Sequence, residues 1–148
     1  MSNTPTDFDQ ALAGQTSWAE ALGIPDGVLE VYAVLGSQYY EQGLLDDART
    51  MFNAVIALNG NSHLGYAGLG ALELLNGNPD GALQQLELAY ARYPQDLVVC
   101  ANLGECLVHL GQPLVAARFL REAAALDPAE VNPYANRARA ILAALPND

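Results

Sequence analysis

Apolar residues recur at helical spacing along most of the chain, but small residues interrupt the pattern at regular intervals. The stretch YAVLGSQYYEQGLLDDA shows the interruption, because Gly36 and Gly43 stand where a simple amphipathic helix carries larger residues. The same residues return after 34 positions and again after another 34, in the aligned sets Leu35, Leu69, Leu103; Gly36, Gly70, Gly104; Gly43, Gly77, Gly111; and Ala48, Ala82, Ala116. A fixed period of this length predicts a stack of repeated helical pairs.

The repeats predict an all-α fold with three pairs of helices. The expected ranges are 29–42 with 45–58, 63–76 with 79–92, and 97–110 with 113–126, and an unpaired helix is expected over 131–145. Ahead of them, FDQALAG and TSWAEALG predict one or two short helices, and GIPDG at 23–27 predicts a turn. These elements divide the chain into an N-terminal helical segment (1–28), three repeats (29–62, 63–96 and 97–130) and a C-terminal capping helix with its tail (131–148).

The aligned positions resemble the tetratricopeptide repeat, a helix–turn–helix unit of 34 residues. That family places Leu-Gly at repeat positions 7 and 8, Gly at 15, Ala at 20, a large apolar residue at 24 and Pro at 32. Here position 24 holds Phe52, Leu86 and Leu120, and position 32 holds Gly60, Pro94 and Pro128. The resemblance covers residues 29–130 and implies a superhelix of stacked repeats.

Each small residue of the repeat has an expected role. Glycine at position 8 is expected to let the second helix of the repeat pack closely, with the alanine at position 20 as the other half of that contact. Glycine at position 15 is expected to end the first helix in a left-handed conformation. Pro79 and Pro113 are expected in the first turns of second helices, where a missing N–H does no harm.

The charge of the chain narrows the choice of partners. Six arginines and no lysines oppose 17 acidic residues, which gives a net charge of -11, and the first 48 residues carry acids but no base. Such a chain is repelled by nucleic acid and by anionic lipid, so we expect neither as a partner. No stretch approaches the ~20 apolar residues of a membrane helix, and no signal peptide is readable, so a cytoplasmic location is expected.

Candidate chemistry is sparse. His63 and His109 have no plausible catalytic partners in the pattern, and no enzyme activity is expected. Cys100 and Cys106 lie about 9 Å apart along one predicted helix, too far for an undistorted disulfide. They are expected to be small core residues in a reducing compartment, and neither a metal site nor a cofactor is predicted.

The resemblance to tetratricopeptide repeats implies a concave groove lined by positions 2, 5, 9 and 12 of each first helix. The candidate peptide-binding residues are Ala33, Ser37, Tyr40, Leu64, Ala67, Ala71, Leu74, Val98, Ala101, Glu105 and Val108, with Asn132, Ala135, Arg139 and, as an open choice, Leu142 continuing the groove. Most of them are small or apolar, which suits an extended peptide that inserts a few apolar side chains. An alternative is that the alanines are small only to let the helices pack.

Two stretches extend the resemblance to one class of repeat proteins. LEVYAVLGSQYYEQG and GECLVHLG are similar to segments of the class II chaperones of type III secretion systems, which hold translocator proteins before export. The resemblance implies that the groove binds an extended segment of such a client and that the N-terminal helices form a homodimer. For the dimer contact we single out Trp18 and Leu22. The competing hypothesis is a generic scaffold that joins folded protein partners.

Overall fold

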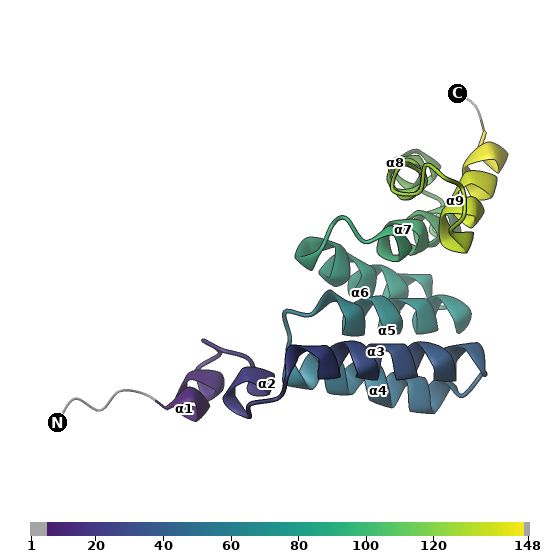
Figure 1. Cartoon of the computed structure of the whole chain (residues 1–148). Helices are drawn as coiled ribbons and strands as arrows, with labels where there is room; N and C mark the ends of the chain where they lie inside the picture. The colour runs from purple at the N-terminus through teal and green to yellow at the C-terminus, as the bar shows by residue number, and fades with distance from the viewer. Residues whose placement is uncertain (1–5, 147–148) are drawn as a thin grey trace. The chain divides into compact units, whose positions relative to one another are not determined.

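The computed structural model describes residues 6–146, and the regular secondary structure in this range is entirely helical. The helices are α1 (Asp7–Leu12), α2 (Trp18–Ala21), α3 (Asp26–Glu41), α4 (Leu45–Leu58), α5 (His63–Leu75), α6 (Pro79–Arg92), α7 (Leu97–His109), α8 (Pro113–Ala125) and α9 (Pro133–Ala144) (Figure 1). The first five and the last two residues of the predicted terminal segments lie outside the described range. The chain divides into two compact units at Gly68 and Leu69, within α5.

The helices of the three predicted pairs begin and end within one residue of the expected positions, with one exception. Helix α3 begins at Asp26, three residues earlier than expected, so the prediction of a turn over all of 23–27 was wrong. Pro25 occupies the N-cap position and Asp26 lies in the first turn, where a negative charge is favourable. Helix α9, by contrast, begins at Pro133, later than the expected residue 131, and the proline lies in its first turn.

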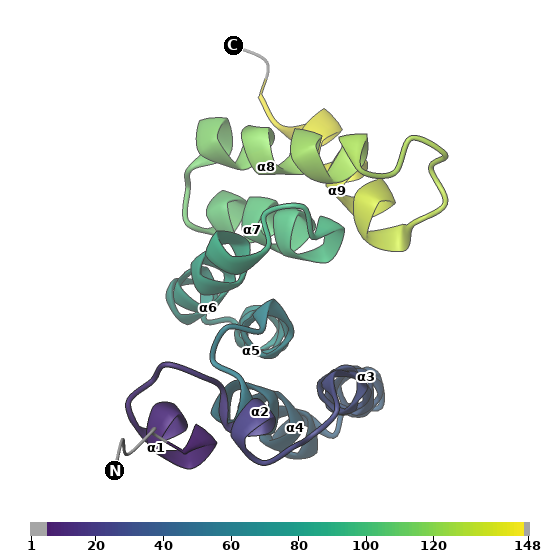
Figure 2. The ribbon, with the colours of Figure 1, turned by 60° about the vertical axis from the view of Figure 1, so that its left-hand side comes forward.

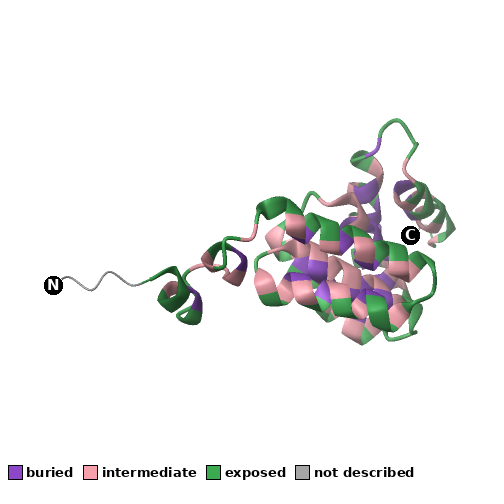
Figure 3. Ribbon diagram, turned by 60° about the horizontal axis from the view of Figure 1, so that its bottom comes forward, coloured by how far each residue is buried: buried purple, intermediate pink, exposed green. Residues whose placement is uncertain are grey.

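In the first unit, α3 and α4 pack side by side (Figure 1), and buried and exposed residues alternate along the ribbon of the helices (Figure 3). Phe52 of α4 is 3% exposed. A β-carbon added to Gly36 would stand 2.6 Å from the Phe52 ring, and one added to Gly68 would overlap the same ring. The ring therefore fits between two helices because both have a glycine where they meet it. Sequence reasoning anticipated the role of Gly36 and overlooked that of Gly68.

The nearest neighbours of the position-8 glycines are the large residues at position 24. Added β-carbons at Gly70 and Gly104 would meet Leu86 and Leu120, each at 2.5 Å. Sequence reasoning named the alanine at position 20 for this contact and did not name position 24. Ala82 and its counterparts Ala48 and Ala116 are fully buried all the same. Gly43, Gly77 and Gly111 have φ values of +77°, +70° and +71°, which confirms the left-handed helix ends.

The N-terminal segment folds into the two short helices that the sequence allows. Thr6 caps α1 by accepting a hydrogen bond from the Asp9 backbone, and the Asp9 carboxylate accepts one from the Thr6 backbone in return. The Phe8 and Trp18 rings meet edge to face, with centroids 5.0 Å apart. Helix α2 also contacts α4, so this segment is attached to the first pair of helices.

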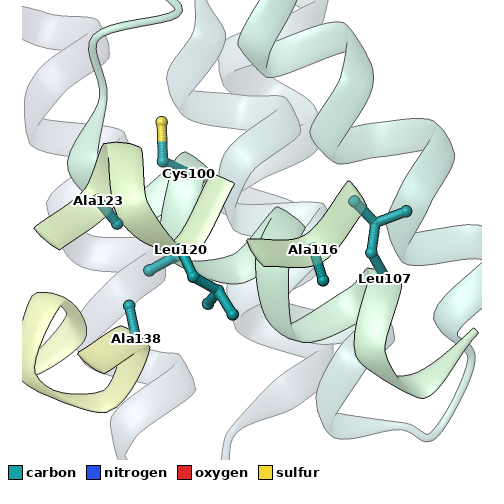
Figure 4. Close-up of a cluster of buried hydrophobic side chains, with 7 residues drawn as sticks. Cys100, Leu107, Ala116, Leu120, Ala123 and Ala138 are labelled. Atoms are coloured by element: carbon teal, nitrogen blue, oxygen red, sulfur yellow. The ribbon is translucent and has the colours of Figure 1, made fainter. Parts of the chain in front are cut away.

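In the second unit, α7 and α8 lie side by side and α9 packs against both (Figures 1 and 2). A buried cluster fills the space between these helices and consists of Cys100, Ala101, Leu107, Ala116, Leu120, Ala123 and Ala138 (Figure 4). Both cysteines are fully buried and free of disulfides. The Sγ atoms of Cys100 and Cys106 donate to the carbonyls of Pro94 and Pro79, at 3.5 and 3.0 Å. Burial is the main cause that raises the pKa of each thiol to about 11.

Candidate functional site

Helix α5 carries an apolar stripe that is only partly covered. We define the α5 stripe as Leu64, Ala67, Ala71 and Leu74, all of which are half-buried. Their spacing of three and four residues places them on one face of the helix. The buried residues of the helix, Gly65, Leu69, Gly70 and Leu72, occupy other positions. The stripe carries no charge, and it contains four of the eleven predicted groove residues.

The predicted residues of α3 are placed less uniformly. Ala33 is buried, Ser37 is exposed and Tyr40 is half-buried. The Ser37 hydroxyl donates to the Ala33 carbonyl at 3.0 Å, so its polar group is used within the helix. The exposed apolar side chains of α3 are instead Val31 and Val34, at 54% and 56% exposure. Sequence reasoning missed these two because it followed the positions that the repeat resemblance implies.

On α7, one predicted groove residue belongs to the core. Ala101 is 1% exposed and sits in the cluster of Figure 4, so its side chain is small because helices pack around it. Val98, Glu105 and Val108 are half-buried. The alternative reading of the alanines as packing residues therefore describes Ala101, and Ala33 on α3 in the same way. Neither Ala33 nor Ala101 is open to contact with a ligand in this structure.

A polar group on α7 and α9 lies beside these residues. Nη2 of Arg137 donates to Oδ1 of Asn102 at 2.8 Å and forms an ion pair with Oε2 of Glu105 at 2.9 Å. The exposed His109 lies one helical turn beyond, with its Nε2 4.0 Å from Oε1 of Glu105. Sequence reasoning identified Glu105 but missed Asn102 and Arg137. The available signal was an asparagine in the apolar run VVCANLGECLV, at a position where the other repeats have Val34 and Gly68.

Three of the residues expected to continue the groove onto α9 make local contacts that hold the helix in place. Oδ1 of Asn132 accepts hydrogen bonds from the Tyr134 and Ala135 backbones, so this residue caps α9. Ala135 is fully buried. Nη2 of Arg139 donates to the carbonyls of Ala124 and Asp127 in the connection from α8 to α9. A groove that continues onto α9 stays a prediction.

The two residues predicted for dimerisation differ in their surroundings. Trp18 is half-buried against Phe8, whereas Leu22 is 55% exposed. Phe8 and Leu12 of α1 are also exposed, at 51% and 68%. The N-terminal segment therefore has apolar side chains available for a contact, and Leu22 is the more accessible of the two predicted residues.

Metal-ligand groups, helix length and the two thiols complete the description of the candidate site. Within residues 6–146, no group of three or more His, Cys, Asp or Glu side chains could hold a metal ion. In the same range, no helix combines the length and apolar character needed to cross a lipid bilayer. The thiols of Cys100 and Cys106 are buried and have raised pKa values, so neither is a ready nucleophile.

Comparisons with known proteins give one family-model match, one curated relative and a set of similar structures. Residues 73–140 match the model of a tetratricopeptide repeat family. A curated relative, the protein CTR9 homolog of Arabidopsis thaliana, is 29% identical over 104 residues, which are 68% of this chain. The match spans only 10% of that protein, so it concerns a segment of a much longer chain.

Solved structures with a similar fold include translocator chaperones of type III secretion. The Yersinia enterocolitica chaperone SycD has a TM-score of 0.72 and 23% identity, with 88% of this chain and 98% of that chain covered. PcrH of Pseudomonas aeruginosa has a TM-score of 0.67 and 29% identity, with coverages of 81% and 92%. PcrH has also been solved with the chaperone binding regions of PopB and PopD.

The fold likeness is shared by a repeat domain of another kind. The tetratricopeptide repeat domain of Arabidopsis OM64 has a TM-score of 0.66 and 23% identity, with coverages of 78% and 94%. The backbone alone therefore does not separate a secretion chaperone from other repeat proteins. The helices, the glycine contacts and the comparisons together establish that this chain has the tetratricopeptide repeat fold. In that fold it resembles the translocator chaperones of type III secretion.

Proposed function

We propose that this chain is a non-enzymatic protein-binding module that holds an extended, apolar segment of a translocator protein before its export. The proposed binding surface includes the α5 stripe, and the half-buried Tyr40, Val98 and Val108 on the first helices of the other repeats are further candidate contacts. The protein acts in the cytoplasm, where two free buried thiols suit the reducing conditions.

The α5 stripe is the observation that carries the proposal. A helix with one buried face normally turns polar residues to the surface on its other face. Here four uncharged residues of one face remain half-buried, and two of them are leucines. Small residues leave room for a backbone, and an extended segment can place alternate apolar side chains against the stripe. The solved complexes of PcrH with PopB and PopD segments support a client of this class.

The test uses a synthetic peptide of the PopB chaperone binding region and measures its affinity by calorimetry. Ala71→Glu places a charge in the apolar stripe, where it stays unpaired, and should weaken binding at least about tenfold. Ala91→Glu makes the same change at an exposed position of α6 and is expected to leave affinity unchanged. Circular dichroism of both variants checks that the fold is kept. Equal affinities of the two variants would move binding away from the stripe.

A generic scaffold that joins folded proteins is the second candidate, and the likeness to the CTR9 homolog and to the OM64 domain favours it. The two functions differ in what they bind. A scaffold binds a folded partner and does not change the solubility of an aggregation-prone client. Co-expression with a translocator protein distinguishes them, because a chaperone should increase the soluble fraction of the client and a scaffold should not.

A further inference from the structure

The junction between the first two repeats differs from the later ones at one pair of positions. Position 24 holds an aromatic residue, Phe52, in the first repeat and a leucine in the other two. Position 6 of the next first helix is Gly68 after Phe52, whereas it is an asparagine after each leucine (Asn102 and Asn136). The largest side chain at position 24 is therefore followed by the smallest residue on the helix that comes next.

The Phe52 ring meets both first helices of this junction. A β-carbon added to Gly36 on α3 would stand 2.6 Å from Cε1 of the ring, and one added to Gly68 on α5 would overlap the same atom. The ring is 3% exposed, so protein atoms surround it and it has almost no surface for a ligand. Phe52 thus acts as a spacer between α3 and the first half of α5.

A second glycine holds α5 close to α4. A β-carbon added to Gly65 would stand 2.6 Å from Cγ1 of Ile56 and 2.8 Å from the main-chain oxygen of Phe52. The first half of α5 therefore approaches the main chain of α4 closely and has little freedom to slide along it. Because protein interiors are close-packed, a change in the volume of a buried side chain moves its neighbours. The size of the Phe52 side chain therefore sets how far this part of α5 stands from α3.

We propose that Phe52 is a positioning residue for the client: its ring sets the space between α3 and α5 and thereby selects which apolar side chains of an extended segment fit there. Half-buried candidate contacts lie on both helices, Tyr40 on α3 and Leu64 and Ala67 on α5. None of the three is charged at neutral pH, so the selection is among apolar groups of different size. This inference rests on the proposed function, since it states how the same surface chooses among clients.

A residue that only fills space would behave differently. Loss of packing alone lowers the fraction of folded chain, and this weakens the binding of every client by the same factor. A change in the space between two helices instead affects a large and a small side chain unequally, and one methylene group in an apolar pocket can be worth about tenfold in affinity. The ratio of the affinities for two clients therefore separates positioning from packing.

The test measures, by calorimetry, the affinities of the full chain for peptides of the PopB and PopD chaperone binding regions. Phe52→Leu makes the spacer smaller and should change the ratio of the two affinities at least about threefold. Phe52→Leu combined with Gly68→Asn gives this junction the residue pair of the later ones and should change the ratio in the same direction. Phe119→Leu makes the same change at a half-buried position of α8 and is the matched control, with no change of the ratio expected.

The possible results separate this inference from the proposed function. Wild-type binding, with a changed ratio in the Phe52 variants and an unchanged ratio in the control, supports the inference. A ratio within about twofold of the wild type in both Phe52 variants overturns it and leaves the proposed function standing. An equal change in the Phe119 control also overturns it, because loss of any ring would then have the same effect. If the wild type binds neither peptide, the proposed function is contradicted and this inference falls with it.

NMR of the wild type decides the remaining cases, in which only one peptide binds or the Phe52 variants do not fold; thermal unfolding shows whether they do. The buried Phe52 ring has almost no surface for the peptide, so its resonances report on the packing between α3 and α5. A shift of these resonances when a binding peptide is added supports the inference. Unchanged ring resonances at saturation overturn it.

Discussion

At the scale of single residues, three contacts between a glycine and a large apolar side chain set the spacing of the helical pairs. Gly36, Gly70 and Gly104 each stand where a β-carbon would press on the position-24 residue of the same repeat. Glycine in a helix costs about 1 kcal/mol relative to alanine. The close approach of two helices offsets that cost, which explains why the glycine returns in every repeat.

Gly70→Ala should therefore lower the free energy of unfolding, although alanine favours helices. The new methyl group would stand 2.5 Å from Cγ of Leu86, which is fully buried and has no room to move. Overpacking costs about 1–3 kcal/mol and outweighs a helix-propensity gain of about 1 kcal/mol. Gly27→Ala on α3, where a β-carbon meets nothing within 4 Å, is the control and should not destabilise the chain. Urea unfolding measures both, and a Gly70→Ala chain as stable as wild type would contradict the packing described here.

Because of the two buried thiols, the free energy of unfolding should change with pH in the alkaline range. The pKa values of Cys100 and Cys106 are raised from 9.0 to about 11 in the folded chain, mainly by burial and then by nearby carboxylates. Between these values the unfolded chain loses thiol protons that the folded chain keeps, so stability should fall as pH rises from about 9 to 11. The limit is about 1.4 kcal/mol per pH unit for each thiol. Urea unfolding across this range measures the slope, and replacing both cysteines by alanine should make it shallower. An unchanged slope would assign it to another group, such as Tyr90, whose pKa is also raised by burial and by Glu122.

At the scale of elements, an ion pair with a buried carboxylate contributes to the attachment of α9. The Asp127 carboxylate, 8% exposed, accepts from the Asn132 backbone at 2.9 Å and lies 3.6 Å from Nη1 of Arg139. Arg139 also donates to two carbonyls of the connection between α8 and α9. Arg139 therefore supplies hydrogen-bond donors at the C-terminal end of α8, where the last carbonyls of a helix have no partner within the helix.

Arg139→Met should loosen α9, because it leaves the Asp127 charge buried without its partner. Removing one member of a buried pair costs about 3–5 kcal/mol, and the partial exposure of Arg139 reduces the expected loss to about 2–3 kcal/mol. Arg121→Met, at an exposed position of α8, should change stability by less than about 0.5 kcal/mol. Hydrogen exchange of the α9 amides reports the effect locally. Equal protection in the two variants would show that apolar packing alone holds the helix.

The helices themselves could be predicted from the sequence because each signal is local. Glycine at Gly43 and its equivalents ends a helix, and Pro79 and Pro113 begin one, in agreement with the structure. The early start of α3 was missed because Pro25 and Asp26 were taken as parts of a turn, while proline and aspartate also favour the start of a helix.

At the scale of the whole molecule, the candidate site was less predictable than the fold. Repeat positions indicate which side of a helix a residue occupies, but they do not show how deeply the next helix covers it. Ala33 and Ala101 share a repeat position with the half-buried Ala67, and both are buried. The pairing of Asn102 with Arg137 joins residues 35 positions apart, so neither helix reveals it alone. The groove as a binding surface stays a prediction.

The last prediction concerns the N-terminal segment and its contact with a second copy of the chain. Phe8, Leu12 and Leu22 are exposed apolar residues at the start of a chain whose first 48 residues carry acids but no base. An apolar contact between two copies is favoured by burial and opposed by the repulsion of these acids. We therefore expect a weak homodimer that becomes tighter as salt screens the repulsion.

Sedimentation at about 50 and 500 mM salt measures the dimer, because the screening length falls from about 14 to 4 Å across that range. Leu22→Glu adds a charge to the expected contact and should give a monomer at both salt concentrations. Leu114→Glu, at a 70% exposed position of α8, makes the same change elsewhere and should dimerise like the wild type. A chain that stays monomeric at high concentration in both salts would contradict the homodimer. A dimer that survives Leu22→Glu would place the contact outside the N-terminal segment, since a charge introduced into an apolar interface has no partner there.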